Sequence, residues 1–302
     1  MSELFHKYMK KNVDLVIVTY LPNRDQLKKG IESLKFQVRN IIVVSNGPDD
    51  FSNFGIIYIH IPLNENLGIG KAQNKGIDMA IRLGADFILT ADQDTIFPLN
   101  YVENVLGIYE ELSSEGRNIA ALGPIFRDEN HKGRIHSMVR FKKFGLAKIH
   151  PAKIPESVSH FISSGMVIPA SAFLVIGKMK EDFFMDWVDT EWCWRAQKHG
   201  FENLQIPTLI VSHELGQYTR SHLGVSITTH SKTREYYKIR NAILLLKDVN
   251  YRTLPIFIYL SKFIAKSVVV NLIKGLNDYR NLKVVYASIL HGIIGRTGKW
   301  TF

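Results

Sequence analysis

Two carboxylates, Asp92 and Asp94, stand two residues apart directly after the apolar run Phe87–Ala91. The run is typical of a buried strand, and side-chain alternation would place both acids on the same side of it. Open α/β sheets bind ligands at the carboxyl ends of their strands. Close like charges repel unless a cation lies between them, so the pair predicts a divalent metal that clamps a diphosphate. A polar strand end with solvated acids is the alternative, and the short motif alone favours that alternative.

A second group of acids lies among large apolar residues between positions 181 and 195. Carboxyl groups beside aromatic side chains can have raised pKa values and act as general bases. Asp186 and Asp189 are the candidates. Asp189 also suits the N-cap of a helix over residues 189–199, so a capped amphipathic helix with Trp192 in the core is the alternative interpretation.

Two more sets of residues could serve the same site. His213 follows an apolar strand and could bind a metal through a neutral imidazole, although a lone histidine more often has a structural role. A predicted helix over residues 229–247 carries side chains that suit phosphate and sugar contacts, with a solvated basic face and buried tyrosines as the alternative. These side chains are Arg234, Tyr236, Tyr237, Arg240 and Asn241.

The glycines of Gly68-Ile69-Gly70-Lys71 do not form a known phosphate-binding motif. A dinucleotide fingerprint needs glycine at position 73, where the chain has Gln73, and a P-loop needs Ser or Thr at position 72, where it has Ala72. The glycines still permit close approach of a ligand to the backbone, or serve only as a helix entry turn.

Apolar runs alternate with helical spacing through the first hundred residues. Strands are expected at 13–20, 41–44, 56–61 and 87–91, and helices at 26–36, within 67–83 and at 101–112. This order predicts an α/β fold with a mostly parallel central sheet flanked by helices, and a nucleotide-binding half at about 12–100. Residues 101–250 would form the acceptor and catalytic half. Within it, 123–155 reads as irregular or β-containing, and 158–169 as a strand with a turn at 163–165.

Composition narrows the class of protein. The 302 residues, 46% hydrophobic and 22% charged, are typical of a globular chain. Cys193 is the only cysteine, which excludes a disulfide or a cysteine zinc site within one chain and fits a reducing compartment. Residues 1–12 are polar and do not resemble a secretory signal.

The final segment is basic and apolar together. Residues 247–302 contain nine Lys or Arg and two acids, a net charge of +7 out of +10 for the chain. Apolar stretches at 254–276 and 282–294 lie beside these charges. Lys262, Lys266 and Lys274, with Ser267 and Asn271, fall on about half of a helical wheel, which predicts interfacial amphipathic helices on an anionic membrane rather than a nucleic-acid groove. Packing of the apolar side on the domain is the alternative.

Taken together, these motifs resemble the family-2 glycosyltransferases of the GT-A fold, most closely bacterial rhamnosyltransferases of O-antigen and other surface polysaccharides. The resemblance covers about residues 12–250, which would form a catalytic domain within 1–250, followed by a basic helical region at 251–302. The motifs that carry it are Val16–Tyr20, Asn66–Gly76, Thr90–Thr95 and Phe184–Trp192, supported by His213–Gly216 and Arg234–Asn241.

The resemblance implies a role for each site residue. Asp94 would bind the metal, Mg²⁺ or Mn²⁺, helped by Asp92 and His213. Asp189 would be the catalytic base, with Asp186 as the competitor because the family's usual glutamate is Val188 here. The family's usual Asp-Asn is Ser45-Asn46 in this chain. The nucleotide would contact Thr19, Tyr20, Asn46, Asn66, Gly68, Asn74, Asp92 and Gln93.

The chemistry that follows is inverting, metal-dependent sugar transfer. The resemblance implies dTDP-β-L-rhamnose as donor and a polyprenyl-diphosphate-linked saccharide as acceptor, at the cytoplasmic face of the cell membrane. The metal neutralises the leaving diphosphate, and one base activates the acceptor hydroxyl on the opposite face of the sugar. Another donor such as a UDP-sugar, a nucleotidyltransferase and a nucleic-acid-binding module are the competing hypotheses.

Overall fold

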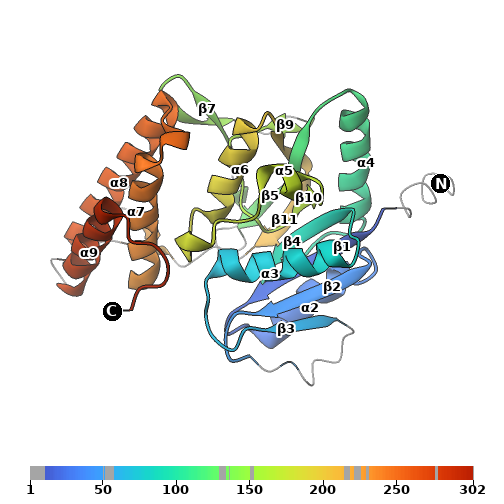
Figure 1. The fold of residues 1–302 in the computed structure, drawn as a ribbon, viewed down its shortest axis with the longest axis horizontal. Helices are drawn as coiled ribbons and strands as arrows, with labels where there is room; N and C mark the ends of the chain where they lie inside the picture. The colour runs from blue at the N-terminus through green and yellow to red at the C-terminus, as the bar shows by residue number, and fades with distance from the viewer. Residues whose placement is uncertain are drawn as a thin grey trace.

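The computed structural model describes residues 11–49, 51, 58–128, 134–135, 137–149, 153–213, 218–220, 226–228, 231–275 and 278–301, and for residues 128, 134, 213, 218–220, 226–228 and 275 the backbone alone. Within these residues the centre is a nine-stranded sheet in the order β3-β2-β1-β4-β10-β5-β11-β9, with β6 paired to β5. The predicted α/β sheet flanked by helices is confirmed (Figure 1).

The first half contains four parallel strands in the order β3-β2-β1-β4. Each residue of β1 from Val13 to Ile17 is buried, which explains why its sequence is apolar apart from Asp14, which forms an ion pair with Arg39. Asn23 caps the first helix by accepting hydrogen bonds from the amides of Asp25 and Gln26. The elements are β1 (Val13–Thr19), α2 (Arg24–Leu34), β2 (Asn40–Ser45), β3 (Ile59–Pro62), α3 (Ile69–Arg82) and β4 (Phe87–Asp92).

The second half inserts one antiparallel strand, β10, between β4 and β5. The strand predicted over 158–169 is therefore shorter than expected, because β10 begins only at Met166, after a turn in which Gly165 has a φ of +79°. The region 123–155, predicted to be irregular or β-containing, holds parts of four strands. The elements are α4 (Tyr101–Ser114), β5 (Ile119–Asp128), β6 (Arg134–Ile135), β7 (Met138–Lys142), β8 (Gly145–Ile149), β9 (Glu156–Ser157), β10 (Met166–Pro169), α5 (Ala172–Ile176), η2 (Glu181–Phe183), α6 (Val188–Lys198), β11 (Glu202–His213), β12 (Tyr218–Arg220) and β13 (Ser226–Thr228).

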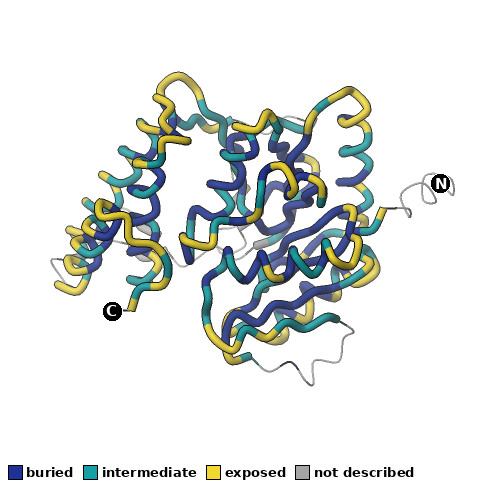
Figure 2. The backbone as a smooth tube through the Cα atoms, viewed as in Figure 1, coloured by how far each residue is buried: buried dark blue, intermediate teal, exposed yellow. Residues whose placement is uncertain are grey.

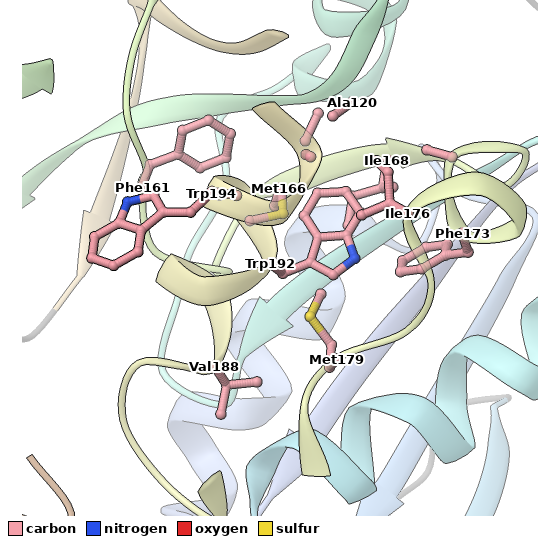
Figure 3. Packing of buried hydrophobic residues seen from close by; sticks show 14 of the residues in the cluster. Ala120, Phe161, Met166, Ile168, Phe173, Ile176, Met179, Val188, Trp192 and Trp194 are labelled. Carbon is pink, nitrogen blue, oxygen red and sulfur yellow. The ribbon is translucent and has the colours of Figure 1, made fainter. Parts of the chain in front are cut away.

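Helix α6 is anchored by an aromatic core. Trp192 is fully buried and donates a hydrogen bond from Nε1 to the carbonyl of Gly177 at 2.8 Å. Figure 3 shows its ring among Met166, Ile168 and Ile176. This packing fixes the first turn of α6, where Asp189 lies.

The C-terminal helices lie together at one side of the molecule (Figure 1). Helices α8 and α9 pack on α7 and on each other, and α8 also contacts β7 and β8. That residues 251–302 form a region of their own stays a prediction. The elements are α7 (Lys232–Lys247), η3 (Val249–Tyr251), α8 (Leu254–Gly275) and α9 (Arg280–Ile294).

The side of helix α8 that packs on the rest of the molecule differs from the side that the helical wheel predicts. Asn271, expected on the solvated polar half, is buried and donates a hydrogen bond to the carboxylate of Glu235 on α7 at 3.2 Å. Ile256 and Leu260 are buried as well, so part of the apolar side of α8 packs on the domain, as the alternative interpretation expected. Other apolar side chains of α8 and α9 point outward, and Figure 2 shows exposed residues along both helices.

Candidate active site

The carboxyl ends of three parallel strands meet at one edge of the sheet. In the register, Thr19 at the end of β1 is opposite Ser45 of β2, and Val18 is opposite Asp92 of β4. The residues predicted to bind the nucleotide therefore lie on adjacent strands. This is the edge at which open α/β sheets bind ligands.

The side chain of Gln93 holds the turn after β1. Its Oε1 accepts a hydrogen bond from the backbone amide of Tyr20 at 2.8 Å. Thr19 donates from its hydroxyl to Asp49 at 3.4 Å, and the ring of Tyr20, about half exposed, lies beside Gly47. Gln93 thus positions Tyr20, whose exposed ring offers a stacking surface to a base.

Two asparagines shape the loop that enters α3. The amide of Asn46 donates to Oδ1 of Asn66 at 3.2 Å, and Oδ1 of Asn46 accepts from the backbone amide of Leu67 at 2.8 Å. Asn66 in turn accepts from the amide of Gly68 at 3.0 Å. These contacts fix the loop between β3 and α3 beside the strand ends.

The glycines of this loop lie against protein. A Cβ on Gly68 would come within 2.6–2.8 Å of Phe184, and one on Gly70 within 2.8 Å of the carbonyl of Lys180. The hypothesis of close approach to a ligand is thereby replaced by close approach to the segment that precedes α6. Gly68 has a φ of +90°, which only glycine adopts readily.

Asn74 has a structural role. It is buried in α3, where its amide donates to the carbonyl of Met179 and to Glu181, both at 2.9 Å, and its Oδ1 accepts from the amide of Met179. Because both polar ends are used by the protein, we leave Asn74 out of the nucleotide-binding set.

The Asp92–Asp94 segment is fixed from two directions. The amide of Asp92 donates to the hydroxyl of Ser164 at 3.0 Å, and that hydroxyl also bonds to Thr95 at 2.7 Å. Ile96 forms an isolated antiparallel bridge with Ser212, the neighbour of His213. The backbone thus brings the end of β11 beside the acid pair, while the His213 side chain lies outside the described part of the structure.

Asp189 lies in the first turn of α6, at the same cluster. Its Oδ2 accepts from the backbone amide of Ser163 at 3.2 Å, and its Oδ1 accepts from the amide of Thr190 at 2.8 Å. The prediction that Asp189 is the N-cap is wrong, because that position belongs to Trp187, in a left-handed conformation with a φ of +67°. The adjacent Ser163 and Ser164 therefore link Asp189 to Asp92.

The charges at this site perturb one another. Burial raises the pKa of Asp189 to about 6; the negative charges of Asp92 and Asp186 add to the shift, and the two amide hydrogen bonds oppose it. Burial also raises the pKa of Asp186, against the positive charges of Arg234 and Lys238. A carboxyl with a pKa near neutrality can serve as a general base.

Arg234 is the cation that faces these acids. Its Nε lies 3.1 Å from Oδ1 of Asp186, and the pKa of its guanidinium is raised mainly by the charge of Asp186, with smaller effects of Asp92 and Asp189. The side chain is about half exposed. Three carboxylates from β4, the loop and α6 therefore surround one arginine from α7.

The comparisons with known proteins identify the family. The model of glycosyl transferase family 2 matches residues 14–176, and dTDP-rhamnosyl transferase RfbF of Shigella flexneri is 33% identical over 96% of this chain and 98% of its own length. The chain belongs to glycosyl transferase family 2. It is therefore a glycosyltransferase, as the sequence predicted.

Solved structures of other glycosyltransferases share the GT-A fold. S. aureus TarS 1–349 aligns over 93% of this chain and 80% of that chain, with a TM-score of 0.55 and 14% identity. GalNAc-T7, solved with UDP, GalNAc and Mn²⁺, aligns over 79% of this chain but only 48% of that chain, with a TM-score of 0.57 and 10% identity. At such low identity the likeness concerns the fold alone.

The donor atoms at the acid pair fit a hard divalent cation. Mg²⁺ is held in proteins by one or two carboxylates together with phosphate oxygens of the substrate. Asp92 and Asp94 would supply the carboxylates. Among the residues with described side chains, no group of three His, Cys, Asp or Glu could hold a metal without such help.

The sequence offered candidate residues for the site but not the residues that support them. Ser163 and Ser164 were visible only as a turn, and nothing local indicates that they join Asp92, 72 residues before Ser164, to Asp189, 26 residues after Ser163. Arg234 was one of five side chains on the predicted helix with equal claims. Only the structure shows which of them contacts the acids: Arg234 pairs with Asp186. The others, Tyr236, Tyr237, Arg240 and Asn241, are buried.

Proposed function

We propose that this glycosyltransferase moves L-rhamnose from dTDP-β-L-rhamnose to an acceptor hydroxyl, with inversion. The observation that carries the reaction type is the convergence of Asp189 with Asp92 at the end of β4, where burial brings the pKa of Asp189 to about 6. The 33% identity to a dTDP-rhamnosyl transferase along nearly the whole chain supports the donor.

Asp189 is the base in this proposal. Its carboxylate accepts the proton of the acceptor hydroxyl as the new glycosidic bond forms on the face opposite the diphosphate. One base and a single displacement convert the β-linked donor into an α-linked product, by the facial logic that governs inverting glycoside hydrolysis. Asp186, the competitor, is paired with Arg234, which stabilises its ionised form and occupies its oxygens.

A divalent cation, Mg²⁺ or Mn²⁺, would be held by Asp94 and Asp92, with His213 as the further predicted ligand. When bound, the cation neutralises charge on the leaving diphosphate. Arg234 lies close enough to Asp92 and Asp189 for their charges to raise its pKa, and it adds a permanent positive charge. The base and the sugar of the nucleotide would be held by Thr19, Tyr20 and the loop between β3 and α3 that Asn46 and Asn66 shape.

The acceptor in this proposal is a polyprenyl-diphosphate-linked saccharide at the inner face of the cell membrane. Its support is the C-terminal apolar face, which we define as Leu254, Phe257, Val269, Leu272 and Ile273 of α8 with Leu282, Tyr286, Leu290, Ile293 and Ile294 of α9, all exposed. Lys262 and Lys266 lie at helical spacing beside these residues. By length and composition Leu254–Lys274 could even span a bilayer, a test that core helices of soluble proteins also pass.

A donor panel tests the proposal. Purified protein with Mn²⁺ and a polyprenyl-diphosphate-linked saccharide acceptor is offered dTDP-rhamnose, UDP-sugars and nucleoside triphosphates, and release of nucleoside diphosphate or pyrophosphate is measured. We expect turnover of dTDP-rhamnose, reduced at least about 100-fold in Asp189→Asn because general-base catalysis contributes about 10²–10⁴-fold. Asp94→Ala should lose Mn²⁺-dependent nucleotide binding. Preference for a UDP-sugar would refute the donor, and pyrophosphate release would indicate a nucleotidyltransferase.

A further inference from the structure

The segment that carries the candidate acids is strained. Phe184, Asp186 and Trp187 have φ values of +62°, +58° and +67°, a left-handed region that residues other than glycine enter at a cost. Such conformations persist only where the surrounding structure over-determines them, and they concentrate at functional sites. The contacts that hold this segment are therefore informative about the site.

Asn241, buried in α7, bonds to three successive parts of the segment. Its Nδ2 lies 3.0 Å from the carbonyl oxygen of Phe183, 2.7 Å from that of Met185 and 3.2 Å from that of Asp186, and donates to them. One amide group therefore fixes the path of the backbone on both sides of Phe184. Trp187 adds a contact to the same helix, donating from Nε1 to the carbonyl of Lys238 at 3.0 Å.

Arg240 orients Asn241 and reaches the segment itself. It is fully buried, and its Nε and Nη2 donate to Oδ1 of Asn241 at 2.9 and 2.8 Å, which leaves the NH₂ group of Asn241 pointing at the carbonyls. The same Nη2 donates to the carbonyl of Phe183 at 2.9 Å. The guanidinium lies over the rings of Tyr236 and Tyr237, 5.4 and 4.8 Å from their centroids.

The last described residues close the arrangement from the other side. The amide of Gly298 donates to the carbonyl of Asp182 at 2.8 Å, and the carbonyl of Gly298 accepts from Nη1 of Arg240 at 2.6 Å. Trp300 stacks on Tyr236 with ring centroids 4.0 Å apart and donates from its amide to the hydroxyl of Tyr237 at 2.8 Å. A segment more than a hundred residues from Asp189 in sequence thus touches the loop that leads to it.

We propose that Arg240, Asn241, Gly298 and Trp300 form a positioning clamp that holds the strained 183–187 backbone and so sets Asp186 and Asp189 for catalysis. The clamp rests on the proposed function only through the role given to Asp189. Its residues act through the loop. The loop joins α6 directly, because the amide of Glu191 donates to the carbonyl of Trp187 at 2.8 Å.

Asn241→Asp is the sharpest variant because it keeps the side chain's size and its acceptor for Arg240 while removing the donors to the three carbonyls. We expect kcat to fall tenfold or more, and the affinity for dTDP with Mn²⁺ to stay within twofold. Without any donor, hydrogen–deuterium exchange of a peptide spanning 182–190 should be faster than in the wild-type protein.

Leu245→Ala is the matched control on the same helix. Leu245 is buried in the core formed with Ala242 and Leu260, so its truncation destabilises the fold without removing a contact of the clamp. It should lower the melting temperature and leave both kcat and the exchange of 182–190 near wild-type values. Equal losses of kcat in the two variants would overturn the clamp, as would a wild-type kcat in Asn241→Asp.

A second pair keeps the test decisive if Asn241→Asp does not fold. Trp300→Ala removes the stacking on Tyr236, while Lys299→Ala changes an exposed neighbour. We expect only Trp300→Ala to speed exchange in 182–190 and lower kcat; unchanged exchange would refute the clamp. Because exchange needs no substrate, a wild-type protein that transfers no rhamnose would contradict the proposed function and leave this comparison intact.

Discussion

At the scale of single residues, the site depends on the Asp189 carboxyl group, whose ionised form is destabilised by burial. The Asp189 carboxyl lies near Asp92 and Asp186, and burial together with these charges brings its pKa to about 6. Its two backbone hydrogen bonds keep it in place as it loses the proton. A base with this pKa is ionised at neutral pH but still accepts a proton readily in the transition state.

The pH dependence of activity should report this group. We expect kcat of the wild-type enzyme to fall about tenfold per pH unit below pH about 6, because a protonated Asp189 cannot accept the acceptor's proton. Asp189→Asn should lose this acidic limb together with about 10²–10⁴ of the rate. An acidic limb that persists in Asp189→Asn would transfer the role of base to Asp186. Glu111→Gln, at an exposed position on α4, is the control.

The same carboxyl should also make stability depend on pH, with a definite sign. Its proton is bound more tightly in the folded than in the unfolded chain, so folding loses stability as pH rises from about 4 to about 6. Asn has no such proton, so the melting temperature of Asp189→Asn relative to wild type should increase over that window. The gain corresponds to about 1–3 kcal/mol. A difference that is constant with pH would contradict the raised pKa.

The candidate acids could be recognised from the sequence more readily than the side chains that support the surrounding fold. Asp92 and Asp189 do lie together, as expected of residues that share a site. Asn74 and Gln93 have the same polar groups, yet their bonding partners are the backbones of Met179 and Tyr20. No local pattern reveals such partners, because they are set by packing between segments far apart in the chain.

At the scale of elements, the start of α3 packs against the 183–187 loop at one glycine, Gly68. Gly68 adopts a positive φ, and its Cα lies so close to Phe184 that a Cβ would meet the backbone at 2.6–2.8 Å. The amide of Ile69 also donates to the carbonyl of Phe184 at 2.7 Å. The loop is therefore held by α3 on one side and by α7 on the other.

Gly68→Ala should move the 183–187 loop, and Gly84→Ala is its matched control. Gly84 has a φ of +74°, but a Cβ there would meet nothing within 4 Å. Gly84→Ala should cost about 1 kcal/mol for its positive φ, and Gly68→Ala should cost more because its φ of +90° with a ψ of 157° belongs to a region that is essentially restricted to glycine and because Phe184 must shift. We expect a lower kcat only in Gly68→Ala, measured beside chemical unfolding; equal kcat in both variants would show that this contact does not matter for the site.

Elements with strong periodicity could be predicted, and those made by context could not. Strands β1, β2 and β4 are buried on both faces, so each leaves a largely apolar run in the sequence, whereas the edge strand β3 is only partly buried. Strand β10 has only four residues and follows a turn, so its start was placed eight residues too early. The positive φ values of Phe184, Asp186 and Trp187 have no signature, because these residue types normally avoid that region.

At the scale of the whole molecule, α8 and α9 pack on the domain through several polar side chains and leave large apolar side chains exposed. Their polar residues Asn271, Ser288 and His291 are buried, while large apolar side chains are exposed. His291 bonds through Nδ1 to the hydroxyl of Tyr236 at 2.7 Å, so this polar contact faces α7. An exposed apolar surface of this kind marks an interaction site, and the neighbouring lysines favour an anionic partner.

Flotation with liposomes tests this orientation of the molecule. We expect the wild-type protein to float with phosphatidylglycerol vesicles, less with neutral vesicles, and less as salt is raised, since each lysine near the surface contributes about 1 kcal/mol. Phe257→Ser combined with Leu290→Ser should lose binding to both kinds of vesicle, whereas Lys262→Glu with Lys266→Glu should lose only the preference for anionic lipid. The control, Phe36→Ser with Leu174→Ser, removes two exposed apolar side chains elsewhere and should float like wild type. If both apolar pairs behave alike, the C-terminal apolar face is not the membrane contact, and transfer to a lipid-linked acceptor would require another surface.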